Sequence, residues 1–352
     1  MKITRFEDCS KIFKLFTMST LLTCGPGSLK VLFKGPAKPK KKPLITVITF
    51  SIYPELTRIW YYFMDSTLSF LKAKNIDAEM LVVDCAGGLD KNQLPNALVE
   101  RFVNERHSRK LDFFIKRYFD SKLVLITDDD CFMLEPGSIM AAVDALLNEE
   151  KLAAYSLFPR PDWNFTINGE PMQPLGSYCV VYDREILIKE RLSFGIPNVK
   201  NPHNGRPYDT GDFLNEQLLN RGYRAAVIDN QAMTESIGGF RAASMHRIIQ
   251  WGATKEGIYS FFMASSKMKY DTRVVYLIKS FYTGTKINTI YKNIYGDAAE
   301  PSMFSEHEWV DFIKALPEGK FKTVLAKDFR AIDSVAEKIL SAGKRNSHVK
   351  RT

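Results

Sequence analysis

Short runs of aliphatic and β-branched residues alternate with amphipathic segments along the first half of the chain. Three of these runs predict buried strands, at residues 44–50, 80–84 and 123–127. Apolar residues at helical spacing predict helices within residues 56–63, 97–103 and 111–119, and a further helix that begins at Pro136. Strands and helices that alternate in this way predict an α/β fold, with a mostly parallel sheet joined by right-handed crossovers.

The second half of the chain has a less regular pattern. Short apolar runs predict strands at residues 156–158, 178–182 and 224–228, and helical spacing predicts helices at 213–219 and 328–340. Ser305 is followed three residues later by Glu308 and then by Trp309, which is the capping-box pattern of a helix start. We therefore expect a helical C-terminal addition to the sheet.

Length and composition place the chain among soluble globular proteins. Its 352 residues allow either one large α/β domain with additions or two domains. Apolar residues make up 45% of the chain and charged residues 25%, which excludes wholesale disorder. No stretch reaches the roughly 18 uncharged apolar residues that a spanning helix needs. The five cysteines form no C-x-x-C pair, which argues against a disulfide framework or zinc knuckle and predicts a reducing, cytoplasmic location.

Positive charge is concentrated at the two ends of the chain. Residues 1–43 carry ten Lys and Arg against two acids, and residues 343–352 carry four basic residues and no acid, so the middle is mildly acidic. The Pro- and Lys-rich run at 34–43 predicts an extended, solvated linker. It can act as a solubilising leader or attach the protein weakly to an anionic membrane inner face. Nucleic-acid binding ranks third, because such folds more often carry their basic stripe on the folded body.

Carboxylates follow two of the predicted strands directly. Asp84 ends the second strand, and Asp128, Asp129 and Asp130 follow the third. Ligands of open α/β sheets bind beyond the carboxyl ends of the strands. Adjacent carboxylates repel one another unless a cation or hydrogen-bond donors neutralise them, and oxygen ligands favour Mg²⁺ or Mn²⁺. The pattern thus predicts a divalent-cation site, although an acidic turn that caps the Pro136 helix, or plain solvation, accounts for the same residues.

Four segments, taken in order, resemble the GT-A glycosyltransferases, most closely the large inverting group called family-two-like. They run from Val82 to Gly87, from Leu125 to Asp130, from Pro174 to Arg184 and from Tyr208 to Arg224. In that family an acid after the second strand helps to hold the nucleoside, and a D-x-D motif at a strand end binds the metal that bridges the diphosphate. The resemblance covers roughly residues 44 to 250.

The resemblance implies a role for individual residues of this chain. It implies a nucleotide-sugar site formed by Thr49, Tyr53, Asp84, Asp128, Asp129 and Gly176. It implies a Mn²⁺ or Mg²⁺ ion held by Asp128, Asp130 and His246, and a catalytic base at Asp209 or Asp212. Two departures bear on these roles: Thr-Gly separates the acids of the last pair, and the segment after Asp84 lacks the family's Ser-rich turn.

The resemblance also implies a reaction and a division of the chain. We expect a metal-dependent, inverting glycosyltransferase that moves a sugar from a nucleoside-diphosphate sugar to a hydroxyl of a glycan, lipid-linked or protein acceptor. The GT-A domain would span residues 44–250, between a basic leader at 1–43 and a helical extension at 251–343 with a basic tail at 344–352.

Two other classes remain open on the sequence. A nucleotidyltransferase can use a strand-end acidic triplet equally well, but does not account for the later segment from Asp209 to Gly222. A non-catalytic protein that docks on membrane or nucleic acid through its basic termini leaves the acidic cluster unexplained. Dinucleotide-binding and P-loop chemistry find no support, because neither glycine motif occurs at a strand–helix junction.

Overall fold

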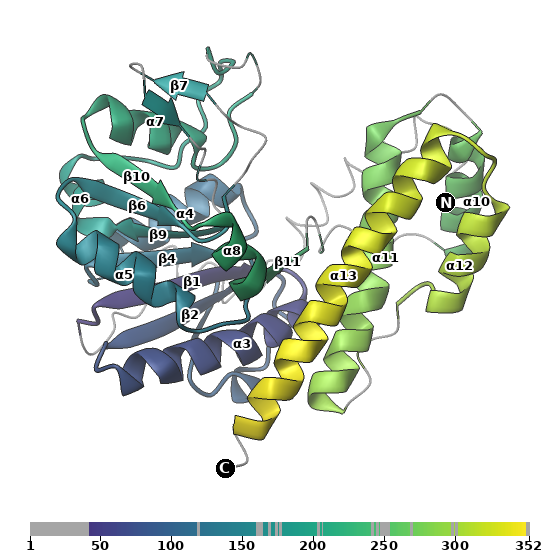
Figure 1. Cartoon of the computed structure of the whole chain (residues 1–352), viewed down its shortest axis with the longest axis horizontal. Coiled ribbons are helices and arrows are strands. Elements are labelled where there is room, and N and C mark those ends of the chain that lie inside the picture. Colours follow the sequence, from purple (N-terminus) through teal and green to yellow (C-terminus); the bar gives the residue numbers. More distant parts are fainter. Residues whose placement is uncertain are drawn as a thin grey trace. The chain divides into compact units, whose positions relative to one another are not determined.

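The structure is a computed structural model of the whole chain (Figure 1). It describes residues 42–349 apart from short gaps at 118–119, 160–164, 168–169, 173–174, 176–177, 203–204, 206, 241–242, 244–245, 247–253, 268–269, 297–298 and 300–301. Nearly all of the predicted basic leader therefore lies outside the described residues. These residues divide into two compact units. The α/β unit comprises residues up to Ser51 and Tyr61–Ile237, and the helical unit comprises Ile52–Trp60 and the chain from Gly238 onward.

A seven-stranded sheet forms the centre of the α/β unit. Its order is β10-β6-β9-β4-β1-β2-β3. The strands are β1 (Ile45–Ser51), β2 (Ala78–Asp84), β3 (Leu98–Arg101), β4 (Leu123–Thr127), β6 (Leu152–Ser156), β9 (Cys179–Asp183) and β10 (Arg224–Val227). Only β9 runs antiparallel to its neighbours β4 and β6. This mostly parallel, helix-flanked sheet confirms the predicted fold class.

The central strands are buried along their whole length. Every residue of β1, β4 and β9 is buried, as expected for strands covered by helices on both faces. In Figure 1, α5 (Ser138–Asn148) lies in front of the sheet and α4 (His107–Arg117) lies behind it. The parallel register pairs Ser51 with Asp84, so the carboxyl ends of β1 and β2 meet at one edge of the sheet.

Shorter elements complete the connections of the α/β unit. They are η1 (Lys91–Gln93), β5 (Cys131–Met133), β7 (Phe165–Ile167), β8 (Glu170–Met172), α6 (Arg184–Lys189), α7 (Asp212–Asn220), α8 (Asn230–Ser236) and β11 (Ile237–Gly239). The long helix α3 (Pro54–Ala73) begins at a proline, whose fixed φ suits the first helical position. Among the residues described, no helix is both long enough and apolar enough to cross a bilayer.

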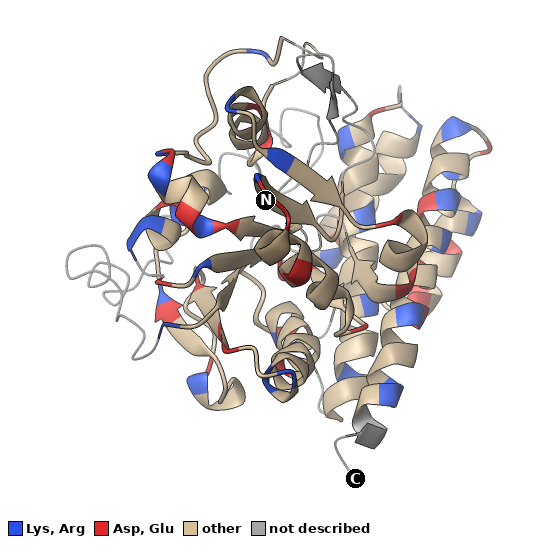
Figure 2. Ribbon diagram, turned by 60° about the vertical axis from the view of Figure 1, so that its left-hand side comes forward, with Lys and Arg blue, Asp and Glu red and all other residues tan. Residues whose placement is uncertain are grey.

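Among the described residues after 250, the helical unit contains four helices. They are α10 (Lys255–Ser266), α11 (Thr272–Tyr295), α12 (Glu306–Ala315) and α13 (Lys320–Val349). The capping box predicted at the start of α12 is present, with the Ser305 side chain accepting from the Glu308 N–H and the Glu308 carboxylate accepting from the Ser305 N–H. Figure 2 shows acidic and basic positions interspersed along these helices.

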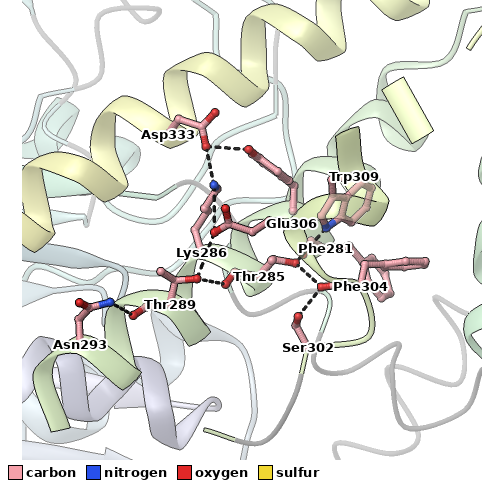
Figure 3. Close-up of polar contacts among 11 residues, drawn as sticks. Phe281, Thr285, Lys286, Thr289, Asn293, Ser302, Phe304, Glu306, Trp309 and Asp333 are labelled. Carbon is pink, nitrogen blue, oxygen red and sulfur yellow. Dashed lines mark hydrogen bonds and ion pairs between the residues drawn. The ribbon is translucent and has the colours of Figure 1, made fainter. Parts of the chain in front are cut away.

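Polar contacts tie three of these helices together (Figure 3). Thr285 on α11 donates to the Phe304 carbonyl at 2.9 Å and accepts from the Trp309 indole N–H at 2.9 Å. The ammonium of Lys286 lies 3.2 Å from Glu306 and 2.9 Å from Asp333 on α13. Because the Thr285 and Trp309 groups are buried, their mutual hydrogen bonds avoid the cost of unsatisfied polar atoms in an aromatic core.

The structure corrects several of the predicted elements. Residues 97–103, expected to be helical, contain the edge strand β3, in which Leu98 and Val99 pair with β2. A short apolar run does not distinguish the two states, and here pairing with a neighbouring strand decides. The strand expected at 156–158 lies earlier, as β6. Helix α13 is longer than predicted and continues to Val349, through the first residues of the predicted basic tail.

Candidate functional site

Asp84 ends β2 with a buried carboxylate that organises the following loop. It accepts hydrogen bonds from the backbone N–H groups of Ala86 at 3.2 Å, Gly87 at 2.7 Å and Leu89 at 3.3 Å. Gly87 has a φ of +76°, a conformation that favours glycine. Three N–H donors satisfy the carboxylate, so Asp84 shapes this loop from within. Its predicted contact with a nucleoside stays a prediction.

The acidic triplet forms a tight turn between β4 and β5. Asp128 donates its backbone N–H to the Tyr178 carbonyl at 2.9 Å, and its own carbonyl accepts from the Cys131 N–H at 3.1 Å. The Asp129 residue is 8% exposed, whereas the Asp128 side chain keeps 29% exposure. The turn therefore presents carboxylates at the end of a buried strand, where the sequence places them.

Three other carboxylates act on Asp128 at this turn. The pKa of Asp128 is raised well above its usual value, first by burial and then by repulsion from Asp130, Asp129 and Asp209. Asp209 lies 81 residues away in the sequence, so the fold brings the second predicted acidic segment close to the first. Repulsion of this kind is relieved by a bound cation. The structure thereby brings Asp128, Asp129, Asp130 and Asp209 into one site.

Asp209 and Asp212 lie in one turn but differ in exposure. Asp212 begins α7 after Gly211, which has a φ of +89°, and its side chain is completely buried. Its carboxylate accepts the Asp209 backbone N–H at 2.6 Å. Asp209 is exposed, and its carboxylate accepts the Thr210 N–H at 2.8 Å. Of the two candidate bases, only Asp209 is open to solvent.

Helix α4 contributes two groups that the sequence did not single out. The Nε2 atom of His107 lies 3.8 Å from a carboxylate oxygen of Asp128, and the imidazole packs edge-to-face on Phe50 at 5.1 Å. Lys110 is 3% exposed. Its ammonium donates to Asn104 at 3.2 Å and lies 3.4 Å from the sulfur of Cys85. The spacing of three residues places His107 and Lys110 on one face of α4, which is the only sequence signal for the pair.

Burial and charge set the protonation of these groups. Burial, followed by repulsion from Lys110, lowers the pKa of His107 to about 3, so the imidazole is neutral at pH 7. The Lys110 ammonium in turn lowers the pKa of Asp128, partly offsetting the effect of the other carboxylates. Burial raises the pKa of the Cys85 thiol despite the neighbouring ammonium, so this cysteine stays a thiol.

Two predicted site residues, Tyr53 and His246, meet within the helical unit. Their rings pack edge-to-face with centroids 5.2 Å apart. The Tyr53 hydroxyl donates to Asn288 at 3.3 Å, and the backbone N–H of His246 donates to Ser280 at 2.8 Å. A Cβ added to Gly284 would lie 2.5 Å from Nε2 of His246, so this edge of the ring faces α11. The metal-ligand role of His246 stays a prediction.

The remaining predicted residues have different outcomes. Thr49 on β1 is fully buried, and its hydroxyl has no hydrogen-bond partner. Gly176 lies outside the described residues.

Within the part of the chain that the structure describes, no three His, Cys, Asp or Glu side chains are arranged to hold a metal. Divalent ions at nucleotide sites, however, commonly use one or two protein carboxylates and complete their coordination with phosphate and water. The carboxylates at Asp128–Asp130 fit that donor set.

Comparisons with known proteins give structural neighbours only. No family model and no curated protein matches the sequence. A mannosyltransferase from Pyrobaculum calidifontis in complex with GDP-Man and Mn²⁺ shares 15% identity, with 96% of each chain covered and a TM-score of 0.40. Glucosyl-3-phosphoglycerate synthase from Mycobacterium tuberculosis in complex with phosphoglyceric acid shares 19% identity over 54% of this chain and 75% of that chain, with a TM-score of 0.36. Scores of this size do not establish a common activity, so function has to be inferred from the residues of this chain.

Proposed function

We propose that the chain is a GT-A glycosyltransferase that transfers a sugar from a nucleoside-diphosphate sugar to an acceptor hydroxyl with the help of a divalent metal ion. One observation carries the proposal: repulsion from Asp209 raises the pKa of Asp128. Asp209 therefore lies near the acidic turn at Asp128–Asp130, at the carboxyl end of a central strand. This juxtaposition supplies a cation-binding group and an exposed carboxylate in one site. A metal-dependent, inverting transfer of a sugar from a nucleoside diphosphate uses both.

The roles divide between the two ends of the sugar–phosphate bond. Asp130 and Asp128 would hold Mn²⁺ or Mg²⁺, which stabilises the negative charge of the leaving diphosphate. Asp129, Asp84, Thr49, Tyr53 and Gly176 are assigned to the nucleotide sugar. Thr49 is fully buried, so its assignment rests on the resemblance alone.

We assign the catalytic base to Asp209 rather than Asp212. The acceptor hydroxyl loses its proton as it attacks the anomeric carbon, and a carboxylate must reach that proton. Asp212 is buried and accepts a backbone N–H, so its role is to hold the turn. A single displacement assisted by Asp209 inverts the anomeric centre, since no covalent sugar intermediate forms.

We propose the acceptor and the location in the cell only as broad classes. A glycan, a lipid-linked group or a protein can supply the acceptor hydroxyl. The ten basic residues within residues 1–43 would add weak attraction to an anionic membrane surface at the cytoplasmic face, at about 1 kcal/mol for each residue near the surface. Nucleic acid is not the expected partner.

A product assay distinguishes this function from its nearest rival. The protein would be incubated with Mn²⁺ and a panel of nucleotide sugars, and the released nucleotide identified by chromatography. A glycosyltransferase releases a nucleoside diphosphate or hydrolyses the donor slowly to the same product, whereas a nucleotidyltransferase forms or consumes pyrophosphate. Asp209→Asn should abolish most release, and Asp229→Asn, which alters the exposed N-cap of α8, is the matched control. Pyrophosphate chemistry, or no turnover of any donor, would remove the proposal.

A further inference from the structure

His107 places an unused nitrogen beside the acidic turn. Its Nε2 atom is buried from solvent and has no hydrogen-bond partner. The Asp128 carboxylate lies 3.8 Å from this atom, which is too long for a hydrogen bond. A buried nitrogen without a partner costs free energy, so a ligand that binds between the imidazole and the carboxylate would gain from both.

The surroundings of the ring hold it in this position. Phe50 supports the imidazole edge-to-face at 5.1 Å, and the Phe50 ring also lies 4.9 Å below the ammonium of Lys110. Lys110 is anchored by Asn104 at 3.2 Å. The Phe50 contact restrains the His107 ring while its Nε2 atom lies 3.8 Å from Asp128. An imidazole nitrogen that is buried without a partner 3.8 Å from a carboxylate oxygen can share a metal ion with that carboxylate.

We propose that Nε2 of His107 is the imidazole ligand of the divalent cation, together with Asp128. The inference rests on the proposed metal-dependent function and goes beyond it by naming the ligand. Imidazole binds transition metals in preference to Mg²⁺, which takes oxygen ligands. His107 thereby favours Mn²⁺ over Mg²⁺ at a site that carboxylates alone would leave open to either ion.

This assignment competes with the one implied for His246. The Nε2 edge of His246 faces Gly284, where an added Cβ would lie 2.5 Å away, and its ring packs on Tyr53 within the helical unit. His107 instead belongs to the same unit as Asp128 and lies directly beside it. The two histidines therefore make different predictions for the same spectroscopic signal.

Electron spin-echo envelope modulation of bound Mn²⁺ tests the proposal, because it detects the ¹⁴N nucleus of a coordinated imidazole. The full chain would be loaded with Mn²⁺ alone and with Mn²⁺ and inorganic pyrophosphate. The wild type should show ¹⁴N modulation. His107→Gln should lose it and bind Mn²⁺ about tenfold more weakly or worse, with Mg²⁺ affinity nearly unchanged. His246→Gln and the exposed His307→Gln should keep both signal and affinity.

Several results of this experiment would overturn the assignment of His107 as a metal ligand. Modulation that persists in His107→Gln, or that disappears in His246→Gln instead, overturns the proposal, as does wild-type protein that binds no Mn²⁺ under either condition. If His107→Gln does not fold, replacing each of the other four histidines in turn should leave the signal intact. Bound Mn²⁺ without nitrogen coupling would reject His107 alone, because donor turnover measured separately would still support the proposed function.

Discussion

The Asp212 carboxylate accepts the backbone N–H of Asp209 at 2.6 Å, and this contact separates the roles of two acids that the sequence left equivalent. Asp212 lies buried at the first turn of α7, where a negative charge is favourable. Asp209 is exposed, and its carboxylate lies near enough to Asp128 to raise the pKa of the Asp128 carboxyl.

The first prediction concerns this pair. Asp209→Asn should lower kcat by about 10²–10⁴-fold, the usual effect of losing a general base, with little change in donor KM or in the unfolding midpoint. Asp212→Ala should instead lower the free energy of unfolding by about 1–3 kcal/mol, because the Asp209 N–H loses its partner. Steady-state kinetics and urea unfolding of both variants check this. Equal kinetic losses without any loss of stability in the Asp212 variant would contradict the assignment.

Local sequence sufficed for part of this site and not for the rest. The position of Asp128–Asp130 follows from an apolar strand that runs directly into three acids, and Asp209, which the resemblance assigned to the same site, lies close enough to raise the pKa of Asp128. His107 and Lys110 were missed because their importance depends on where α4 packs, which is a tertiary contact that no local pattern encodes.

Local sequence also predicted only some of the helices and strands of the fold. The fully buried strands β1, β4 and β9 were predicted correctly, since continuous apolar runs identify them. Helix α11 was missed because its buried residues lie on all sides, from Val274 to Tyr291, so no amphipathic stripe stands out. The edge strand β3 was missed because pairing with β2, rather than its own periodicity, determines its conformation.

Gly284 provides a test of the position of His246. Gly284→Ala would place a Cβ 2.5 Å from Nε2 and 2.6 Å from Cδ2 of the imidazole, so the ring must move. Overpacking of this kind costs about 1–3 kcal/mol. The unfolding free energy should fall accordingly, whereas Gly137→Ala, where an added Cβ meets nothing within 4 Å, should change it by less than about 1 kcal/mol. Wild-type stability in Gly284→Ala would show that His246 lies elsewhere.

Asp84 links the loop after β2 to donor binding. Asp84→Ala removes the acceptor of three backbone N–H groups and should both destabilise the protein by about 2–3 kcal/mol and weaken nucleotide binding. Calorimetric titration with UDP, GDP and CDP in the presence of Mn²⁺ measures the second effect. Asp90→Ala, which removes the exposed N-cap of the short helix η1, is the neighbouring control. Unchanged nucleotide affinity in Asp84→Ala would confine Asp84 to a structural role.

Glu308 should make the stability of the protein depend on acid pH. Its hydrogen bond with Lys255 and those with Ser305 lower its pKa from 4.5 to about 2. A carboxyl whose pKa is lower in the folded state stabilises the fold above pH 4.5 and loses that effect as the pH falls toward 2. Glu308→Gln should therefore reduce stability at pH 7 and flatten its decline between these values. Because the side chain is 39% exposed, solvent screening keeps the effect small. Parallel pH profiles of the two proteins would contradict this.

The central claim is that the acidic turn binds a nucleoside diphosphate through a divalent metal. Isothermal titration of the full chain with UDP and GDP, in Mn²⁺ and in excess EDTA, tests it most directly. The account predicts that one of these nucleotides binds in Mn²⁺, that EDTA weakens binding by about tenfold or more, and that Asp130→Ala abolishes the metal-dependent part while the fold stays intact. Nucleotide affinity that is the same in EDTA, or that survives Asp130→Ala unchanged, would contradict it.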